Sequence, residues 1–315
     1  MRRKFLLERV LLPDKKLVTV TDNKTESKPR TWEVIWSIAI YSGPSPLALS
    51  PAPESIVPTI TREHITDVQA SFVADPFMVR EGNQWILFFE VLNAGNRRGE
   101  IGLATSRDAF HWQYQGIVLR EPFHLSYPYV FLWNGEYYMV PETLDLGCIQ
   151  LYRAVQFPTQ WERCASLVPG VYADPTVFRH DGRWWMFACG RPRRHDEVAL
   201  FHADDLRGPW MPHPQNPLIK GDPRRARPAG RVIAWNGGVL RLAQDCVPEY
   251  GTQVRAFAVS ELTPQTYREI ELPESPLLSP GKAWNADGMH HMDAHQLEDG
   301  KWIACVDGYE TRWFD

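Results

Sequence analysis

The chain has 315 residues, of which 44% are hydrophobic and 23% charged, with a formal net charge of −4. These proportions are those of a folded globular protein, and they exclude a disordered chain or a collagen-like repeat. No uncharged apolar run approaches the roughly 20 residues that a membrane-spanning helix needs. The 26 Pro and 21 Gly interrupt helices, so the composition favours an all-β fold.

The first thirty residues differ in charge from the rest of the chain. Residues 1–30 form a basic arm with nine Lys and Arg against four Asp and Glu, which leaves the remainder acidic. An acidic body is a poor partner for nucleic acid, because binding phosphates requires a basic surface. For the arm, the alternatives are contact with an anionic membrane surface, contact with a partner protein, or a frayed terminus.

Neither the N-terminus nor the cysteines indicate export. The apolar run Phe5–Leu7 is followed at once by charged residues and no small-residue cleavage site comes after it, so we expect no export signal. The five Cys are an odd number without CxxC spacing, which predicts free thiols rather than a disulfide framework. We therefore expect a cytoplasmic protein.

Five segments of the chain share one pattern of a polar residue, an apolar strand, a Gly turn and an aromatic strand. The polar residues that start them are Asp75, Tyr127, Asp174, Arg227 and Asp293. A repeat of about fifty residues with four short strands has the size of one propeller blade. The sequence therefore predicts one five-bladed β-propeller domain over residues 31–315, with blades that start near these five residues.

The fifth repeat stops at Asp315 without its last strand. A propeller must close its ring, because an open sheet edge promotes aggregation. Residues 31–41 alternate between apolar and polar side chains and are rich in β-formers. We expect this N-terminal strand to join the last blade and close the ring.

The start of each repeat also predicts the position of a site. In a propeller the innermost strand of each blade lines the central channel, so the five polar starts would surround one axial pocket. An Asp-Pro pair can be a simple turn starter. Matching pairs at Asp75 and Asp174, on blades one and three, favour a functional site over two unrelated turns.

These features resemble the five-bladed propeller superfamily of glycosidases, which includes arabinanases, xylosidases, invertases and levansucrases. In that superfamily one Asp on blade one is the base or nucleophile, an Asp on blade three orients the substrate and tunes the pKa, and a Glu supplies the proton. The resemblance assigns the first two roles to Asp75 and Asp174. The sequence departs from the pattern at blade four, where residues 227–231 replace the usual Glu.

A closer resemblance covers nearly the whole span from residue 75 to residue 307. It is carried by residues 72–77, 99–102, 141–143, 226–231, 244–246 with 250–251, and 290–293. These segments are similar to the N-terminal domain of plant glucosamine inositolphosphorylceramide transferases and its stand-alone bacterial relatives. The resemblance implies a carbohydrate or glycolipid substrate and a glycosyltransferase as partner. It leaves cleavage, transfer and binding open.

Glycoside cleavage needs two carboxyl groups on opposite sides of the bond, one protonated and one ionised. We expect Asp75 to be the base or nucleophile and Glu142 to be the acid, because Glu142 follows an apolar strand where burial would raise its pKa. Glu90 is the equivalent residue on blade one and the rival candidate. The alternative is a carboxylate paired with Arg227 or Arg231, which would make a rigid sugar-binding rim without proton transfer.

Further polar and aromatic residues at strand starts and loops are candidates for substrate binding, the rings by stacking and the Arg side chains by pairing with anionic groups. A metal site is one interpretation of His290, His291, Asp293 and His295, the last three of which strand alternation puts on one face. We favour hydrogen bonding to sugar, with no cofactor beyond a weakly bound axial Ca²⁺ or Na⁺. The predicted substrate-binding set is Glu90, His124, Tyr127, Tyr129, Arg191, Arg227, Arg231, Asp245, Tyr250, His291, Asp293 and His295.

Three hypotheses for function follow. The first is a carbohydrate-active protein that hydrolyses or transfers a glycosidic bond in the axial pocket. The alternatives are a non-catalytic glycan-binding module that works with a glycosyltransferase, and a scaffold for protein interactions. An enzyme needs a protonated carboxyl group in the pocket at neutral pH, whereas a binding module tolerates carboxylates that are all ionised and paired.

Overall fold

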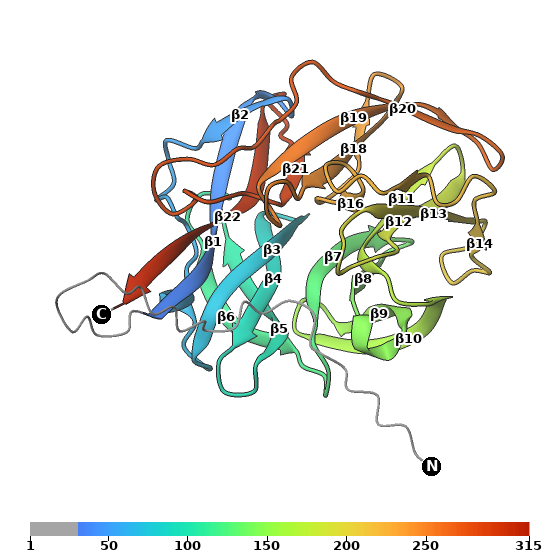
Figure 1. The fold of residues 1–315 in the computed structure, drawn as a ribbon. Coiled ribbons are helices and arrows are strands. Elements are labelled where there is room, and N and C mark those ends of the chain that lie inside the picture. The colour runs from blue at the N-terminus through green and yellow to red at the C-terminus, as the bar shows by residue number, and fades with distance from the viewer. Residues whose placement is uncertain (1–30, 315) are drawn as a thin grey trace, which may run out of the picture.

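The computed structural model describes residues 31–314, so the predicted basic arm lies outside the described residues. Five antiparallel sheets are arranged around a central axis (Figure 1). This arrangement is the predicted all-β, five-bladed propeller. The helical elements within residues 31–314 are two single turns, η1 (Arg62–His64) and η2 (Leu144–Leu146). Neither of them is long and apolar enough to cross a membrane.

Each blade contains a path of four strands that runs from the axis outward, and the innermost strand comes first in the order below. Blade one is β3 (Ala70–Glu81), β4 (Gln84–Asn93), β5 (Arg98–Ser106) and β6 (Gln113–Leu119). Blade two is β7 (Ser126–Trp133), β8 (Glu136–Glu142), β9 (Cys148–Gln156) and β10 (Gln160–Pro169). Blade three is β11 (Ala173–His180), β12 (Arg183–Cys189), β13 (Glu197–Ala203) and β14 (Met211–Pro212), and β15 (Ile219–Lys220) also pairs with β13.

Blade four is β16 (Arg227–Pro228), β18 (Gly238–Asp245), β19 (Gln253–Leu262) and β20 (Tyr267–Glu271), and β17 (Ile233–Trp235) also pairs with β18. Blade five is β21 (Met292–Gln296), β22 (Trp302–Phe314), β1 (Thr31–Ser45) and β2 (Ala48–Pro51). The innermost strands of neighbouring blades contact one another around the axis. Residues that are far apart in the sequence therefore meet at the centre.

The ring closes in blade five, as predicted. Strand β1 pairs with β22 from Thr31 opposite Phe314 to Gly43 opposite Trp302. Strand β2 then continues the sheet outward from β1. The N-terminal segment thus supplies two strands of the last blade, where the sequence analysis expected one.

A β-bulge interrupts the innermost strand in each of the first three blades. Asp75, Tyr127 and Asp174 have positive φ angles of 53°, 48° and 51°, and the strand register shifts at each of them. A bulge of this kind turns one side chain out of the regular alternation and redirects it. Such a backbone costs of order 1–3 kcal/mol per residue and is common at functional sites. The repeated polar starts therefore mark the points where the backbone bends at the axis.

Candidate active site

A cleft of about 470 Å³ opens on the propeller axis. Its residues come from blade one, blade two, blade four and the closing strands of blade five. They are Trp32, Val34, Trp36, Phe72, Ala74, Asp75, Glu90, His124, Ser126, Arg227, Glu249, Tyr250, His290, Tyr309, Thr311 and Trp313. Five of the predicted site residues are in this set, namely Asp75, Glu90, His124, Arg227 and Tyr250.

Asp75 lies at the centre of this cleft and is held by hydrogen bonds from two directions. Its backbone N–H donates to Asp307 Oδ2 at 2.9 Å, and its own Oδ2 accepts the backbone N–H of Tyr127 at 3.2 Å. The other oxygen, Oδ1, lies 3.8 Å from His290 Nε2. Burial raises the pKa of Asp75 to about 7, because the nearby carboxylates of Asp307 and Asp174 add to desolvation and outweigh the opposing charge of His290.

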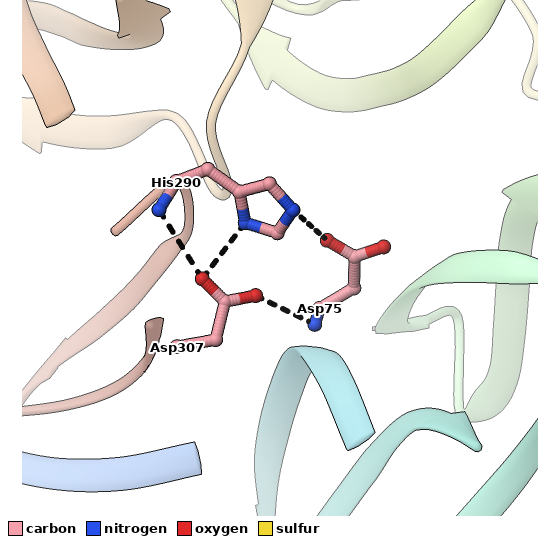
Figure 2. Close-up of side chains that lie close together, drawn as sticks. All are labelled: Asp75, His290 and Asp307. Carbon is pink, nitrogen blue, oxygen red and sulfur yellow. Dashed lines mark hydrogen bonds and ion pairs between the residues drawn. The ribbon is translucent and has the colours of Figure 1, made fainter. Parts of the chain in front are cut away.

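His290 bridges Asp75 and Asp307, as Figure 2 shows. Its Nδ1 lies 2.8 Å from Asp307 Oδ1, and its ring stacks on Trp36 with the ring centroids 4.0 Å apart. Burial alone would lower the pKa of His290, but ionised Asp307 and Asp75 raise it above its usual value. Asp307, His290 and Asp75 therefore form a carboxylate–imidazole–carboxyl chain that ends in the cleft.

His290 and Asp307 are not among the site residues predicted from the sequence, where His290 was named only as a possible metal ligand. A signal for Asp307 was present, because the second strand of four repeats ends near a carboxyl residue. These residues are Glu90, Glu142, Asp245 and Asp307. His290 follows β20 by a long loop and precedes the fifth repeat, so the repeat pattern did not mark it.

Glu90 is the second carboxyl group of the cleft. It lies on β4 directly opposite Ala74, the residue before Asp75. Its Oε1 is buried and, among the described residues, accepts no hydrogen bond, although His124 Nε2 lies 3.3 Å away. Burial raises the pKa of Glu90 well above its usual value, and the charge of Asp75 raises it further. Both effects favour the protonated form of Glu90.

The tautomer of His124 follows from its own hydrogen bond. The backbone N–H of Gly99 donates to His124 Nδ1 at 2.9 Å, so in the neutral ring the proton is on Nε2, which faces Glu90. Burial lowers the pKa of His124 to about 4, which keeps the ring neutral. A Cβ atom on Gly99 would lie 2.1 Å from the Leu125 carbonyl oxygen and 2.7 Å from Glu90 Oε1. Only glycine fits this close approach.

Glu142, the predicted acid, does not line the cleft. Its Oε2 accepts the backbone N–H of Asp174 at 3.1 Å and lies 3.5 Å from Arg227 Nη2. Arg227 also pairs with Asp174, with 2.5 Å between Nε and Oδ2. The three side chains form a buried cluster, and pairing with Arg227 is the alternative left open by the sequence. Burial and the charge of Asp174 nevertheless raise the pKa of Glu142 well above its usual value, so only the position of Glu142 outside the cleft separates it from Glu90. The geometry therefore favours Glu90 over Glu142 as the proton donor, and it places Asp174 beside Arg227 rather than in the cleft.

A second buried network lies further along the axis. Arg231 Nε is 2.5 Å from Asp293 Oδ1, and the guanidinium sits over the Tyr129 ring at 4.8 Å. Asp293 Oδ2 accepts the backbone N–H of Met78 and lies 3.0 Å from His295 Nε2. Burial raises the pKa of Asp293, but the charges of Arg231 and His295 hold it well below its usual range. None of these predicted binding residues lines the cleft.

The remaining predicted binding residues also lie outside the cleft. Tyr127 is fully buried, and its hydroxyl group bonds Thr176 Oγ1 at 2.7 Å, so its ring is not free to stack on a sugar. Arg191 pairs with Asp196, and Asp245 pairs with Arg255. His291 is fully buried with no hydrogen bond to the described residues, and burial lowers its pKa to about 4.

In the described part of the chain, one group of side chains could hold a metal ion, and it consists of Asp75, His290 and Asp307. Their ligand atoms lie within 4.8 Å of one another. The hydrogen bond between His290 and Asp307 already satisfies two of these atoms. A hard cation such as Ca²⁺ prefers six or more oxygen ligands, which this group does not offer. The residues therefore do not fit a tightly bound Ca²⁺.

The fold and the cleft define a class, the five-bladed β-propellers with carboxyl groups and aromatic rings at the axis. The family described as "Glucosamine inositolphosphorylceramide transferase 1, N-terminal" matches residues 30–309, and the chain belongs to this family. This confirms the resemblance found in the sequence.

The similar proteins include two plant relatives. Proteins named "Glucosamine inositolphosphorylceramide transferase 1" from Oryza sativa subsp. japonica and Arabidopsis thaliana are each 35% identical to this chain in an alignment of 295 residues that covers 87% of this chain. The alignment covers 40% and 39% of their lengths, respectively. An exo-1,5-α-L-arabinanase from a bovine ruminal metagenomic library has a similar fold, with a TM-score of 0.55 at 12% identity over 78% of this chain and 94% of that chain.

Proposed function

We propose that this protein binds a carbohydrate in the axial cleft and acts on a glycosidic bond there, by hydrolysis or by transfer. The observation that carries the proposal is the pair formed by Asp75 and Glu90. Both carboxyl groups line the same cleft, and each has a histidine within 4 Å, His290 beside Asp75 and His124 beside Glu90. The name of the plant relatives refers to glucosamine and inositolphosphorylceramide, which supports a glycan or glycolipid substrate.

The two carboxyl groups suit different roles. The pKa of Asp75, raised to about 7, is close to the value that a general base needs at neutral pH. Burial and the charge of Asp75 raise the pKa of Glu90 well above its usual value, which favours the protonated form that an acid needs. In hydrolysis, the bond between the anomeric carbon and the leaving oxygen breaks, Glu90 gives its proton to that oxygen, and Asp75 takes a proton from the attacking water. If Asp75 is instead the nucleophile, one of its carboxylate oxygens attacks the anomeric carbon.

A second function, a glycan-binding module without catalysis, is supported by the other carboxylates. Asp174 and Glu142 are paired with Arg227, and Asp293 is paired with Arg231. Such pairs make a rigid frame, and none of these three carboxyl groups lines the cleft. The two functions differ in what they require of Glu90, because only catalysis needs its proton.

The test compares Glu90→Gln with Glu142→Gln. Both substitutions remove a buried carboxyl group of the same type, but only Glu90 lines the cleft. With a panel of phenyl glycosides, whose unactivated leaving oxygen needs a proton, we expect the wild type to release phenol and Glu90→Gln to lose about 10²–10⁴-fold in rate. Glu142→Gln should keep most of the activity. Loss of activity in Glu142→Gln alone would restore Glu142 as the acid.

A glycan array covers the other outcome. If no aryl glycoside is cleaved but wild type and Glu90→Gln bind the same glycans equally well, the protein is a binding module. The absence of both cleavage and glycan binding would refute the carbohydrate proposal. The predicted cytoplasmic location, the glycosyltransferase partner and the membrane contact of residues 1–30 stay predictions, and so does weak binding of an axial cation.

A further inference from the structure

One wall of the cleft is a two-stranded ribbon formed by the first and last strands. Three cross-strand pairs of β1 and β22 line the cleft, and each pair is two residues further out than the one before. The pairs are Trp36 with Tyr309, Val34 with Thr311, and Trp32 with Trp313. Side chains two apart on a strand share a face, so all six point to the same side of the ribbon. Figure 1 shows β1 and β22 leaving the body of the propeller together near the C-terminus.

The wall begins at the proposed catalytic residues. Trp36 stacks on His290, and Tyr309 lies 4.4 Å from Trp36 between ring centroids. Both Trp36 and Tyr309 are buried, whereas Trp313 at the outer end is 55% exposed. A strand rises about 3.4 Å per residue, so the wall extends about 14 Å from Trp36 to Trp32. This length exceeds what a single sugar ring bound beside Asp75 would cover.

The opposite face of the ribbon is charged. Glu33 pairs with Arg62, and Glu310 pairs with Arg312. Apart from Phe314 at its end, the ribbon therefore turns its aromatic side chains to the cleft and its charged side chains away from it. Large exposed aromatic side chains that continue a binding cleft indicate a ligand surface rather than a folding requirement.

From these observations we propose that the ribbon face formed by Trp32, Val34, Trp36, Tyr309, Thr311 and Trp313 binds the second and further sugar units of an oligosaccharide. The first sugar unit, which reacts or anchors the oligosaccharide, lies beside Asp75. Flat aromatic rings offer an apolar surface to the C–H face of a sugar, and the open outer end leaves its hydroxyl groups in water. A lipid chain would instead require an apolar groove closed to water. The inference rests on the proposed carbohydrate function and names its substrate class as an extended glycan.

The test measures affinity against chain length. Isothermal titration calorimetry of the wild type would compare monosaccharides with their linear trisaccharides in the arabinose, xylose, mannose and N-acetylglucosamine series. We expect at least one trisaccharide to bind tenfold or more tightly than its monosaccharide. Trp313→Ala should lower the affinity for that trisaccharide by about three- to tenfold, as expected for the loss of one aromatic contact. The affinity for the monosaccharide should not change.

Phe314→Ala is the matched control. Phe314 neighbours Trp313 on β22, is 38% exposed and does not line the cleft. Because both positions are exposed at the end of the ribbon, neither substitution should unfold the protein, which the melting temperature of each variant verifies. Phe314→Ala should bind the trisaccharide as the wild type does.

Each other outcome has a distinct meaning. Equal affinities for the monosaccharide and the trisaccharide, or an unchanged trisaccharide affinity in Trp313→Ala, would refute the binding of further sugar units along the ribbon. Either result would leave the proposed function intact. Binding of none of these sugars by the wild type would overturn both. Binding to phosphatidylcholine vesicles that is lost in Trp313→Ala, without any effect on sugar affinity, would make the ribbon a membrane contact and also overturn the inference.

Discussion

Replacing Asp75 with Asn tests the electrostatics of the cleft without requiring a substrate. Asn has nearly the same shape as Asp and keeps an oxygen to accept the backbone N–H of Tyr127, but it cannot ionise. Burial raises the pKa of Asp75 from 3.8 to about 7 in the folded protein. A group with a higher pKa in the folded state binds its proton more tightly there. Its contribution to stability is therefore complete below about pH 4 and is lost as the pH rises to about 7.

The size of the effect follows from the shift. One pKa unit corresponds to about 1.4 kcal/mol, so ionising Asp75 in the folded protein costs about 4 kcal/mol above pH 7. Asn avoids this cost. We expect Asp75→Asn to be more stable than the wild type by up to about 4 kcal/mol near pH 8 and to approach it near pH 4. This difference would be the free-energy cost of keeping an ionised carboxyl group buried in the cleft.

Urea unfolding followed by tryptophan fluorescence at several pH values measures this difference. Between about pH 4 and 7, the difference in the free energy of unfolding should grow by about 1.4 kcal/mol per pH unit. Asp293→Asn is the control with the opposite sign, because Arg231 holds the pKa of Asp293 well below its usual range. That variant should be less stable than the wild type at neutral pH. A difference for Asp75→Asn that does not change with pH would refute the reasoning.

Two further predictions use the same unfolding measurement, and a third uses the pH dependence of the rate. Gly99→Ala should cost about 1–3 kcal/mol of unfolding free energy, because its Cβ meets the fixed carbonyl of Leu125, and a cost near zero would contradict the close approach. Arg227→Met should cost about 3–5 kcal/mol, because it leaves the buried carboxyl groups beside it without their cation, and a neutral result would mean that they are protonated. His290→Gln removes a positive charge that lowers the pKa of Asp75, so the acidic limb of the pH–rate profile should move to higher pH. A purely structural role of His290 would change the rate and leave the limb in place.

The fold was predictable because its signals are local and repeated. Each blade shows the same succession of a polar start, a Gly turn and an aromatic strand, and strand alternation needs only neighbouring residues. The same regularity marked Asp75, since the innermost strand of a blade always faces the axis. The sequence also predicted that residues 31–41 close the ring, although it did not show that the segment supplies two strands.

The choice between Glu90 and Glu142 was not accessible to the same reasoning. The two residues occupy equivalent places on β4 and β8, and their local sequences do not separate them. Contacts between blades determine which of the two carboxyl groups is hydrogen-bonded. Glu142 accepts the backbone N–H of Asp174, whereas the corresponding N–H of Tyr127 is taken by Asp75, which leaves Glu90 Oε1 without a hydrogen bond.

The sequence by itself therefore determined the architecture, the closing strand and the central carboxyl group, because these depend on periodicities that each segment carries alone. The tertiary structure decided which carboxyl groups are paired, brought His290 and Asp307 to Asp75, and joined Trp32 to Trp313 across the ring closure. The contacts to Asp75 and the ring closure connect residues more than two hundred positions apart. Pairing and protonation of buried charges depend on such neighbours, and no local pattern specifies them.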